Sequence, residues 1–548
     1  MSVRPLVLVI APGDEEYRGY CLEQVADAYD VAVITTGPLT WETPYVVDHE
    51  TVGDFDDVDG LIAAAAAVAG RRPIAGVLTW NESHLTAVAR LAEHLGLAVT
   101  SVESVLTCRG KAAGRAAFAR HGVPSARSVT ATSLDEALAV ADEIGFPVVV
   151  KPAAVGGSIG VIKAETREDL AAAYAFAARG VQLHGGDNAS VLVEEYLDGE
   201  EVSVECVTVQ GVTTAVAVTR KELGAQPLFE EVGHTLTAGD PLLETVAPIA
   251  AAAVKATGVT GGIQHVEMRL TATGPRVIEV NGRIGGDWIG WAVWRATGLS
   301  LPRIAADIAT GTAPDLAPTR GQSVAIKVLY APESGTLTKR SIVPGFAETA
   351  GWVHGPAWLM NVGDQALLPP DGDLDSSRVG LFATYADTLD LAVARRTATA
   401  NHITVTTSGP GPSTGDGVRQ AARTRPGRPA LPGRRRRPAV GNRTPAERVP
   451  LAGRPPAAQP RRPADLPRPA GRTPPVARSG PAVVDPSPPR PDRGGVVEGE
   501  LRRPHAGRDH RCGHRHLHHR RRIQSNHPSR RPRTGRVGGV AEHRLRVA

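Results

Sequence analysis

The chain has 548 residues and a formal net charge of +4, but that average joins two unlike parts. Residues 409–548 carry 32 arginines, no lysine and 9 acidic residues, a net charge of +23, whereas residues 1–408 carry a net charge of −19. No apolar run approaches the roughly 18 residues of a membrane-spanning helix. The four scattered cysteines contain no CxxC pair and so indicate neither a disulfide framework nor a thiolate zinc site. The first apolar run, Leu6–Ile10, is too short for a secretory signal, so we expect a cytoplasmic protein without membrane contact.

The arginine-rich part, residues 409–548, has the composition of a disordered segment. It holds 24 of the 44 prolines and no Phe, Trp or Tyr, so it cannot bury enough apolar surface to offset the entropy lost on ordering. Arginine without lysine, beside excess Pro, Ala, Gly and His, is what GC-rich DNA encodes when read out of frame, and we favour that interpretation. The alternatives are a genuine basic tail and an arm that binds nucleic acid through phosphates, although no aromatic residue is present there for base stacking. We attribute the histidines of His510–His519 to this composition and not to a metal site.

The first 105 residues alternate strand-like and helix-like segments. Short β-rich runs bounded by turn residues predict strands, and apolar residues at helical spacing predict helices between them. This alternation argues for a parallel sheet flanked by helices, so we expect a small α/β domain. No GxGxxG follows the first strand, and that motif therefore indicates no dinucleotide site. The predicted strands are Leu6–Ile10, Val31–Thr35 and Gly76–Thr79, and the predicted helices are Tyr17–Ala28, Val58–Ala69 and Ser83–Leu95.

The chain continues as a mixed region in which β-rich runs outnumber helices. The predicted helices are Lys111–Arg120, Leu134–Ile144 and Leu242–Thr257. The predicted strands and apolar runs are Phe146–Pro152, Val191–Tyr196, Val202–Val209, Gln264–Leu270 and Arg276–Val280.

The last two predicted strands carry the most informative polar residues. If the loop Thr271–Pro275 closes a hairpin, Glu267 faces Glu279 across it. His265 and Asn281 then face each other on the same side of the sheet. Two opposed carboxylates without a partner would destabilise the sheet, and a divalent cation between them is the economical explanation. Carboxylate and amide oxygens select a hard ion such as Mg²⁺, whose shell nucleotide phosphates normally complete; the alternative is a solvated hairpin face.

A glycine-rich segment supplies candidates for phosphate binding: Gly156, Gly157, Ser158 and Gly160. Glycines let successive backbone N–H groups turn toward an anion, and the serine adds a hydroxyl donor. No Gly-Lys-Ser/Thr follows, so this is not a Walker loop, and alone it fits an ordinary turn equally well. Lys151 ends an apolar run just before the segment, where a lysine usually pairs with a fixed anion or reaches solvent. Its position strengthens the phosphate interpretation.

Several short motifs follow one another in a fixed order along residues 1–406. They are Thr79-Trp-Asn-Glu82, Cys108–Arg115, His121-Gly-Val-Pro124, Phe146–Pro152, Gly156–Val161, Val193–Glu205, Gln264-His-Val-Glu267 and Val277–Gly286. In this order and spacing the chain resembles the ATP-grasp superfamily, specifically its carboxylate–amine ligases and most closely the amino-acid (dipeptide) ligase group. Asn281-Gly-Arg283 replaces the Asn-Pro-Arg common elsewhere in the superfamily, which is compatible with the amino-acid ligases.

The resemblance implies ATP and Mg²⁺ as cofactors, with Mn²⁺ as an alternative metal. The residues that would contact the phosphates, adenine and ribose are Lys111, Lys151, Gly156, Gly157, Ser158, Gly160, Glu194, Glu195, Tyr196 and Glu201. The matching magnesium ligands are Glu267, Glu279 and Asn281, in agreement with the hairpin.

The resemblance also implies residues on the substrate side. Arg283 matches an arginine that contacts the transferred phosphate or the substrate carboxylate. Lys221 and the stretch Phe229–His234 resemble the substrate-side loop of the amino-acid ligases. His234 is a candidate for steadying the acyl phosphate or the tetrahedral intermediate, and the alternative is a histidine with a purely structural role.

The implied fold class combines α/β and α+β structure. An N-terminal α/β pre-ATP-grasp domain would occupy residues 1–105. A two-part ATP-grasp domain would follow, with a lid at 106–191 and a catalytic core at 192–320. A small closing subdomain at 321–408 would precede the disordered tail at 409–548.

The expected activity is an ATP-dependent ligation of a small-molecule carboxylate to an amine, both amino-acid-like. It would proceed through an acyl phosphate and release ADP and phosphate. The family suggests a homodimer, and nucleic acid would bind only through the tail. Two rival functions stay open: a bicarbonate-using ATP-grasp carboxylase, although no Met-Lys-Met biotinylation sequence occurs here, and a nucleotide- or nucleic-acid-binding protein without ligase activity.

Overall fold

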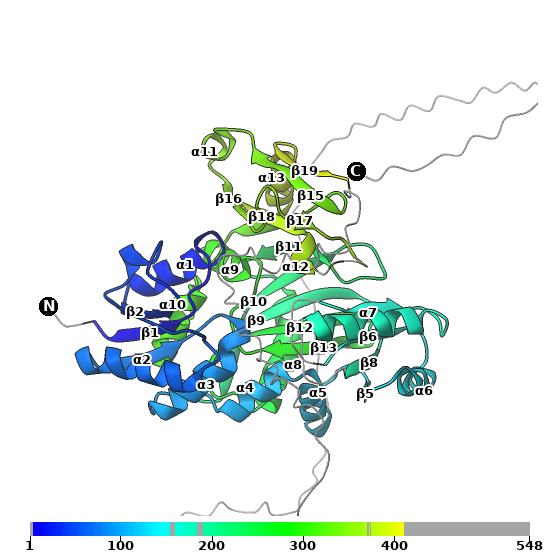
Figure 1. The fold of residues 1–548 in the computed structure, drawn as a ribbon, viewed down its shortest axis with the longest axis horizontal. Coiled ribbons are helices and arrows are strands. Elements are labelled where there is room, and N and C mark those ends of the chain that lie inside the picture. Colours follow the sequence, from blue (N-terminus) through cyan, green and yellow to red (C-terminus); the bar gives the residue numbers. More distant parts are fainter. Residues whose placement is uncertain (1–3, 154–158, 184–189, 370–371, 373, 410–548) are drawn as a thin grey trace, which may run out of the picture. The chain divides into compact units, whose positions relative to one another are not determined.

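Residues 4–153, 159–183, 190–369, 372 and 374–409 are described by a computed structural model of the chain, and Figure 1 shows their fold. Their strands form four sheets, one parallel and three antiparallel, with helices packed between and over them. This confirms the expected combination of α/β and α+β structure. The expectations for Gly156, Gly157 and Ser158, and for residues 410–548, lie outside the described residues. None of the helices in the described part combines the length and apolar character that a membrane crossing requires.

The N-terminal sheet is parallel, as expected, with the order β3-β2-β1-β4. Its strands are β1 (Leu6–Ile10), β2 (Asp30–Thr35), β3 (Asp48–Thr51) and β4 (Ile74–Leu78), and its helices are α1 (Glu15–Ala26), α2 (Val58–Arg71), α3 (Leu85–His94) and α4 (Val102–Arg109). Alternate residues of a strand point to opposite faces. Leu6, Leu8 and Ile10 therefore pack with α2 and α3, whereas Val7 and Val9 pack with α1.

A second sheet, here called the lid sheet, has the antiparallel order β5-β8-β6-β7. Its strands are β5 (Ser128–Ala131), β6 (Val148–Pro152), β7 (Ile162–Ala164) and β8 (Val191–Glu195), and its neighbouring helices are α5 (Lys111–Arg120), α6 (Leu134–Ile144) and α7 (Leu170–Leu183). Small buried residues of α6 and α7 pack on the valines of β6 and β8. Because β8 crosses the expected lid boundary at residue 191, we propose that the lid extends to Glu195.

The core sheet has eight antiparallel strands in the order β13-β12-β9-β10-β11-β14-β18-β16. They are β9 (Glu200–Val209), β10 (Val212–Leu223), β11 (Glu231–Thr237), β12 (Gly262–Thr271), β13 (Gly274–Asn281), β14 (Ser323–Tyr330), β16 (Val353–Trp358) and β18 (Arg378–Ala386). Helix α8 (Leu242–Ala256) packs against one part of this sheet, and α9 (Ile289–Thr297) and α10 (Leu301–Ala309) pack against another. Strands from the expected catalytic core and from the expected closing subdomain thus share one sheet.

The last described segments form a smaller sheet of three strands. Its order is β17-β15-β19, with β15 (Gly335–Ile342), β17 (Gln365–Ala366) and β19 (Ile403–Ser408). Helices α11 (Phe346–Ala350), α12 (Leu374–Ser377) and α13 (Leu389–Ala400) accompany these strands.

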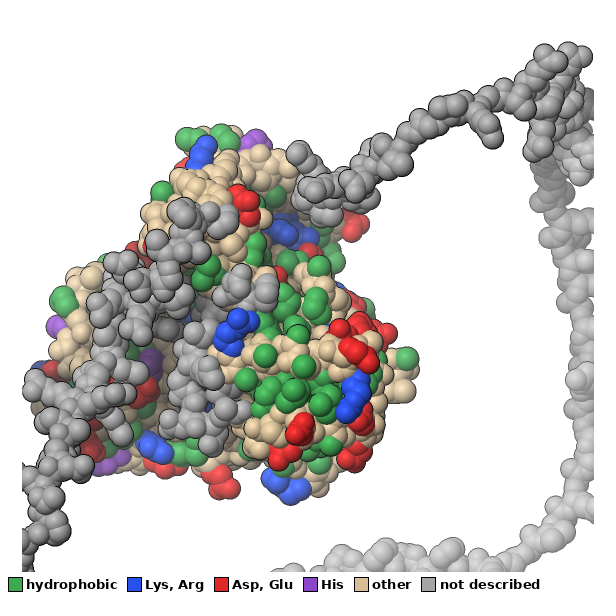
Figure 2. Space-filling model, turned by 45° about the vertical axis from the view of Figure 1, so that its right-hand side comes forward, with side chains coloured by type: hydrophobic (Ala, Val, Ile, Leu, Met, Phe, Trp, Pro, Cys, Tyr) green, Lys and Arg blue, Asp and Glu red, His purple; other side chains and the backbone are tan. Residues whose placement is uncertain are grey.

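Figure 2 shows acidic side chains spread among hydrophobic ones on the lobe at its right, in keeping with the acidic composition of residues 1–408.

The hairpin β12–β13 has a different turn from the one expected. The five-residue loop Thr271–Pro275 is wrong, because Thr271 already pairs with Gly274 and only two residues remain in the turn. Gly274 has a φ of 110°, which glycine adopts without steric cost. Ile278 then forms a bulge that shifts the register by one residue. The bulge restores the expected facing of Glu267 and Glu279, which is confirmed.

Candidate functional site

A cavity of about 410 Å³ is lined by residues of the N-terminal part, the lid sheet and the core sheet. Its lining begins at Ala11 and ends at Arg378, so residues far apart in the sequence meet there. The charged and aromatic lining residues that bear on its chemistry are Tyr17, Arg18, Glu82, Lys111, Arg115, Lys151, Glu194, Tyr196, Glu201, Glu231, Glu267, Glu279, Arg283, Asp287 and Arg378.

One side of the cavity carries a buried cluster of two cations and one carboxylate. The Lys151 Nζ on β6 lies 2.6 Å from the Glu194 Oε2 on β8. Arg115 on α5 donates to both Glu194 oxygens, at 2.7 and 2.9 Å. Burial would raise the pKa of Glu194, but the charges of Arg115 and Lys151 outweigh it and hold that pKa well below its usual range. The cluster therefore has a net positive charge and suits a bound anion.

The hairpin brings the expected metal-binding residues to one face of the sheet. His265 pairs with Asn281, and Glu267 pairs with Glu279. The Lys111 Nζ lies 2.6 Å from the Glu279 Oε2, and the Asn281 amide donates to the other Glu279 oxygen at 3.1 Å. Burial would lower the pKa of Lys111, but the Glu279 carboxylate outweighs it and raises that pKa. Lysine thus supplies here the positive charge that two opposed carboxylates need.

Lys221 on β10 lies among three further carboxylates. Its Nζ is 2.8 Å from Glu231, 3.2 Å from Glu267 and 3.5 Å from Glu201, and the side chain is only 1% exposed. The oxygens of the three glutamates are close enough together to hold a metal ion. The ammonium group of Lys221 already lies in contact with each of them. We therefore interpret this cluster as ion pairs with Lys221. We expect the candidate metal to lie on the side of Glu267 that faces Glu279.

His265 links a fully buried carboxylate to Glu267. Its Nδ1 lies 2.7 Å from the Glu205 Oε1, and its Nε2 lies 3.2 Å from the Glu267 Oε1. Glu205 is 0% exposed and also accepts a hydrogen bond from Ser203. Burial would lower the pKa of His265, but Glu205 and then Glu267 outweigh it and raise that pKa to about 9. The ring is fixed at both nitrogens, and so it holds Glu267 in one orientation.

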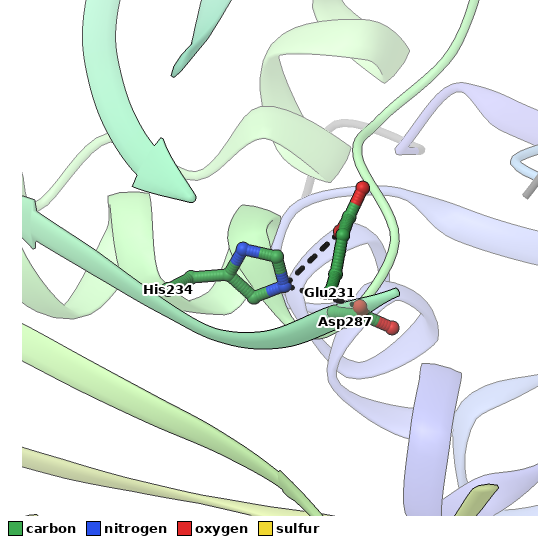
Figure 3. Close-up of side chains that lie close together, drawn as sticks. All are labelled: Glu231, His234 and Asp287. Carbon is green, nitrogen blue, oxygen red and sulfur yellow. Dashed lines mark hydrogen bonds and ion pairs between the residues drawn. The ribbon is translucent and has the colours of Figure 1, made fainter. Parts of the chain in front are cut away.

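His234 on β11 points at two acidic residues, as Figure 3 shows. Its Nε2 lies 3.1 Å from the Asp287 Oδ2 and 3.4 Å from the Glu231 Oε2. These three side chains could also approach one metal ion. However, Arg378 already contacts Asp287 and Lys221 already contacts Glu231, so a divalent cation would meet two positive charges. The cluster is better described as a hydrogen-bonded network.

Asp287 joins three segments of the chain at the cavity wall. It accepts hydrogen bonds from Arg378 of β18 and from the Tyr17 hydroxyl of α1, and its own backbone N–H donates to that hydroxyl. Burial would raise the pKa of Asp287, but Arg378, His234 and Tyr17 outweigh it and hold that pKa far below its usual value. The backbone φ of Asp287 is 49°, a conformation that costs a non-glycine residue about 1–2 kcal/mol. Its three partners maintain that conformation.

Arg283 lies beside a carboxylate of the N-terminal part. Its Nε is 2.9 Å from the Glu82 Oε2, and Arg109 approaches the other Glu82 oxygen at 3.4 Å. Nearby, the Arg18 Nη1 donates to the Gly285 carbonyl at 3.1 Å. This end of the cavity therefore holds charges of both signs contributed by separate parts of the fold.

The expected site residues fall into four groups. Those that line the cavity are Lys111, Lys151, Glu194, Glu195, Tyr196, Glu201, Glu267, Glu279 and Arg283. Behind the lining, Lys221 and His234 contact the lining residue Glu231, and Asn281 contacts Glu279. Gly160 lies at a φ of 70°, and a Cβ there would come within 2.9 Å of Pro152. Gly156, Gly157 and Ser158 lie outside the described residues.

Sequence reasoning assigned no role to several residues that the fold brings to the site. Arg115 follows Lys111 by four residues on α5, and this spacing places both on one helix face, which is a signal that could have found it. Glu82 stood within a quoted motif without a role. Tyr17, Asp287 and Arg378 come from segments more than 90 residues apart, and no local pattern connects them.

The donor groups present fit a nucleotide and a hard metal ion. Glu267, Glu279 and Asn281 offer carboxylate and amide oxygens on one face, which suits Mg²⁺. Lys111, Lys151 and the bidentate Arg115–Glu194 pair place positive charge beside them, as phosphate binding requires.

Comparisons with known proteins point to one family. A family model described as an ATP-grasp domain matches residues 144–291. The phosphoribosylamine–glycine ligase of Streptomyces coelicolor is 30% identical over 409 residues, which cover 71% of this chain and 93% of that relative. The alanine–anticapsin ligase of Bacillus subtilis is 28% identical over 229 residues, 38% of this chain and 48% of that relative.

The solved structures agree on the fold. An L-amino acid ligase from Bacillus licheniformis superposes with a TM-score of 0.62 at 20% identity, covering 75% of this chain and all of that one. The chain spans less than two thirds of the length of the first curated relatives that it matches, namely 66%, 45% and 37%.

Proposed function

Because the chain belongs to the ATP-grasp family, we propose that it is an ATP-dependent ligase that joins a small-molecule carboxylate to an amine, with amino acids as the substrate class. ATP and Mg²⁺ are the cofactors of this family. The amino-acid class is supported by the relatives named above, whose names are those of a glycine ligase, an alanine ligase and an L-amino acid ligase.

One observation carries the proposal. A buried positive cluster on the lid sheet and an opposed carboxylate pair on the core hairpin line the same cavity. Phosphoryl transfer needs this combination, because positive groups must surround the phosphates while oxygen ligands hold the metal. Arg283 lies two residues beyond the hairpin and lines the same cavity, and we propose that it contacts the carboxylate that is phosphorylated.

The reaction proceeds in two steps. First, an oxygen of the substrate carboxylate attacks the γ-phosphorus of ATP, the bond to the bridging oxygen breaks, and ADP leaves with the electron pair. Second, the amine nitrogen forms a bond to the acyl carbon, the carbon–oxygen bond to phosphate breaks, and phosphate leaves while the amine loses a proton. Glu267, Glu279 and Asn281 would hold Mg²⁺, which would neutralise charge on the transferring group. Positioning and charge stabilisation supply most of the rate enhancement, since phosphate leaves readily.

The ion pairs of the cavity couple nucleotide binding to metal binding. Lys111 contacts Glu279, so it must move if it is to hold a phosphate. That movement releases the Glu279 carboxylate for the metal. Lys151 can serve the phosphates without leaving Glu194, because Arg115 keeps the cluster positive. We infer that Lys111 exchanges partners as the nucleotide and metal enter together.

The geometry limits what His234 can do. Its Nε2 faces two carboxylates and is therefore the ring nitrogen that donates toward them. Its buried Nδ1 has no partner among the described residues. A hydrogen bond from Nδ1 to an oxyanion would require a hydrogen on that atom.

A screen of amino acids, singly and in pairs, tests the proposed ligase. We expect ATP-dependent phosphate release with specific pairs, and mass spectrometry should detect the matching amide. Glu279→Gln should lower turnover by about a hundredfold or more, the size of effect seen when one group that stabilises transition-state charge is lost. The matched control is Glu200→Gln, because Glu200 pairs with Arg220 outside the cavity lining and should leave turnover unchanged. Full turnover in Glu279→Gln would refute the assignment of the metal site.

A further inference from the structure

We propose that Arg378 binds the carboxylate of the amine substrate, so that the amine is itself an amino acid and not a simple amine. This inference rests on the proposed ligase function and names a substrate subsite within the same cavity. It starts from the hydrogen bonds that Arg378 makes and from the one edge of its guanidinium group that stays without a good acceptor.

Arg378 begins β18 and lines the cavity with a side chain that is only 11% exposed. Its Nη1 donates to Asp287, and its Nη2 approaches the Tyr330 hydroxyl at 3.4 Å. Its Nε is buried and has no acceptor among the described residues. A buried N–H without an acceptor costs about 1–3 kcal/mol. The Nε–Nη2 edge is thus short of an acceptor on the wall of a substrate cavity.

A carboxylate is the group that fits this edge. A guanidinium group offers parallel N–H donors in a planar fork that two carboxylate oxygens match. The phosphates of the nucleotide are accounted for at the other side of the cavity, by Lys111 and by the Lys151–Arg115 cluster. A metal is excluded at Arg378 by its own charge.

The carboxylate belongs to the amine and not to the acid. In the proposed reaction the acid's carboxylate must lie at the metal and Arg283, where it is phosphorylated. The carboxylate of an amino-acid nucleophile takes no part in bond formation and must be held elsewhere. Arg283 pairs with Glu82 and Arg378 pairs with Asp287, so the two arginines have separate anchors while both line the one cavity.

The neighbours of Arg378 hold it rigidly. Asp287 anchors Nη1 and is itself fixed by Tyr17 and His234. The Tyr330 hydroxyl donates to the Glu231 carbonyl at 3.0 Å, which fixes the ring beside Nη2. A substrate carboxylate would therefore meet a preorganised donor edge, and little side-chain entropy would be lost on binding.

The test compares nucleophiles that differ only in the carboxylate. The full-length protein is first assayed with hydroxylamine and each of the twenty amino acids as acyl donor, which reports acyl transfer without a carboxylate on the nucleophile. Each amino acid and its carboxamide are then compared as nucleophiles, in wild type, Arg378→Gln and Arg378→Lys. The control is Arg340→Gln, because Arg340 contacts Asn361 outside the cavity lining.

We expect Arg378→Gln to raise the KM of the amino-acid nucleophile about ten- to a hundredfold, the range for a charged hydrogen bond. In the same variant, hydroxamate formation and the KM of the carboxamide should stay within about twofold of wild type. The KM of the amino acid in Arg378→Lys should lie between those of wild type and Arg378→Gln, because lysine keeps the charge without the planar fork of donors. Thermal melting shows whether each variant is folded. If Arg378→Gln does not fold, the comparison of Arg378→Lys with wild type decides the test.

Three results would overturn the inference. An equal rise for the amino acid and its carboxamide would mean that Arg378 does not recognise the carboxylate. A raised KM for the acyl donor in the hydroxylamine assay would place the carboxylate on the acid instead. Unchanged kinetics would remove Arg378 from the subsite. If wild type forms no hydroxamate with any acyl donor, the ligase function fails, and this inference fails with it.

Discussion

Lys111, Lys151 and Lys221 each lie within 3.5 Å of carboxylates that line the same cavity. An unpaired buried charge is expensive, whereas a paired and hydrogen-bonded one is tolerated. These ion pairs therefore stabilise the charged side chains of the cavity while no nucleotide is bound. When a ligand binds at such a site, charged side chains exchange their carboxylate partners for groups of the ligand, as we infer for Lys111.

The contact between the buried His265 and Glu267 can be tested by mutation. His265→Asn keeps an amide near Glu205 but removes the contact with Glu267, so we expect the Mg²⁺ concentration for half-maximal turnover to rise about 10–100-fold. Magnesium titration of ATP turnover measures this. His265→Leu leaves Glu205 buried without its partner and should cost about 3–5 kcal/mol in urea unfolding. An unchanged magnesium requirement in His265→Asn would mean that His265 does not position a metal ligand.

Part of the site could be predicted from the sequence because it is local. Glu267 and Glu279 face each other through the period of two in paired strands, and this facing survived a wrong turn because the bulge at Ile278 compensated. Asp287 and Arg378 could not be predicted, since only the folded chain brings them together. The partners of Lys221 were missed for the same reason.

At the scale of elements, the core sheet is extended by strands that follow residue 320. Strands β14, β18 and β16 complete the sheet, and β16 carries His354, which stacks on Trp291 of α9 with ring centroids 4.1 Å apart. Trp288, which precedes α9, lies against the same ring at 4.4 Å. This contact joins the end of the sheet to the segment that follows Asp287 at the cavity wall.

The histidine in this stack makes stability depend on pH. Burial lowers the pKa of His354 from 6.5 to about 4. The unfolded chain therefore takes up a proton below pH 6.5 that the folded chain refuses, and stability is lost as the pH falls from about 6.5 to about 4. His354→Phe keeps an aromatic ring and removes this titration. We expect urea unfolding to show a smaller loss between pH 7 and pH 5 in the variant than in wild type; equal losses would contradict the assignment.

The helices that were predicted from the sequence have bounds close to those observed, whereas α4, α7, α9, α10 and α13 were not predicted. The bounds of α6 match the prediction because both ends are signalled locally: Ser133 accepts a hydrogen bond from the Glu136 N–H, and Gly145 adopts a φ of 91°. Strand β3 was not predicted, because its residues Asp48–Thr51 are polar and lie at a sheet edge. The extension of the core sheet beyond residue 320 depends on pairing between distant strands, which no local pattern encodes.

At the scale of the whole molecule, one cavity draws residues from the N-terminal part, the lid sheet and the core sheet. The lining residues that the structure describes lie between Ala11 and Arg378, within the acidic part of the chain. The mild overall charge of +4 therefore says little about the site.

Removal of residues 410–548 tests this separation. The truncated chain retains every described lining residue of the cavity and keeps β19, which pairs with β15. We expect its ATP-dependent turnover and melting temperature to match those of the full-length chain, measured side by side at equal ionic strength. Loss of turnover in a folded truncated protein would assign the basic part a role in the chemistry.

In the proposed reaction a carboxylate oxygen attacks ATP, and oxygen labelling follows that oxygen into the product. The acid substrate is supplied with ¹⁸O in both carboxylate positions, and the released phosphate is analysed by mass spectrometry. We expect one ¹⁸O atom in each phosphate, because the attacking oxygen leaves with the phosphoryl group. Unlabelled phosphate accompanying amide formation would contradict it.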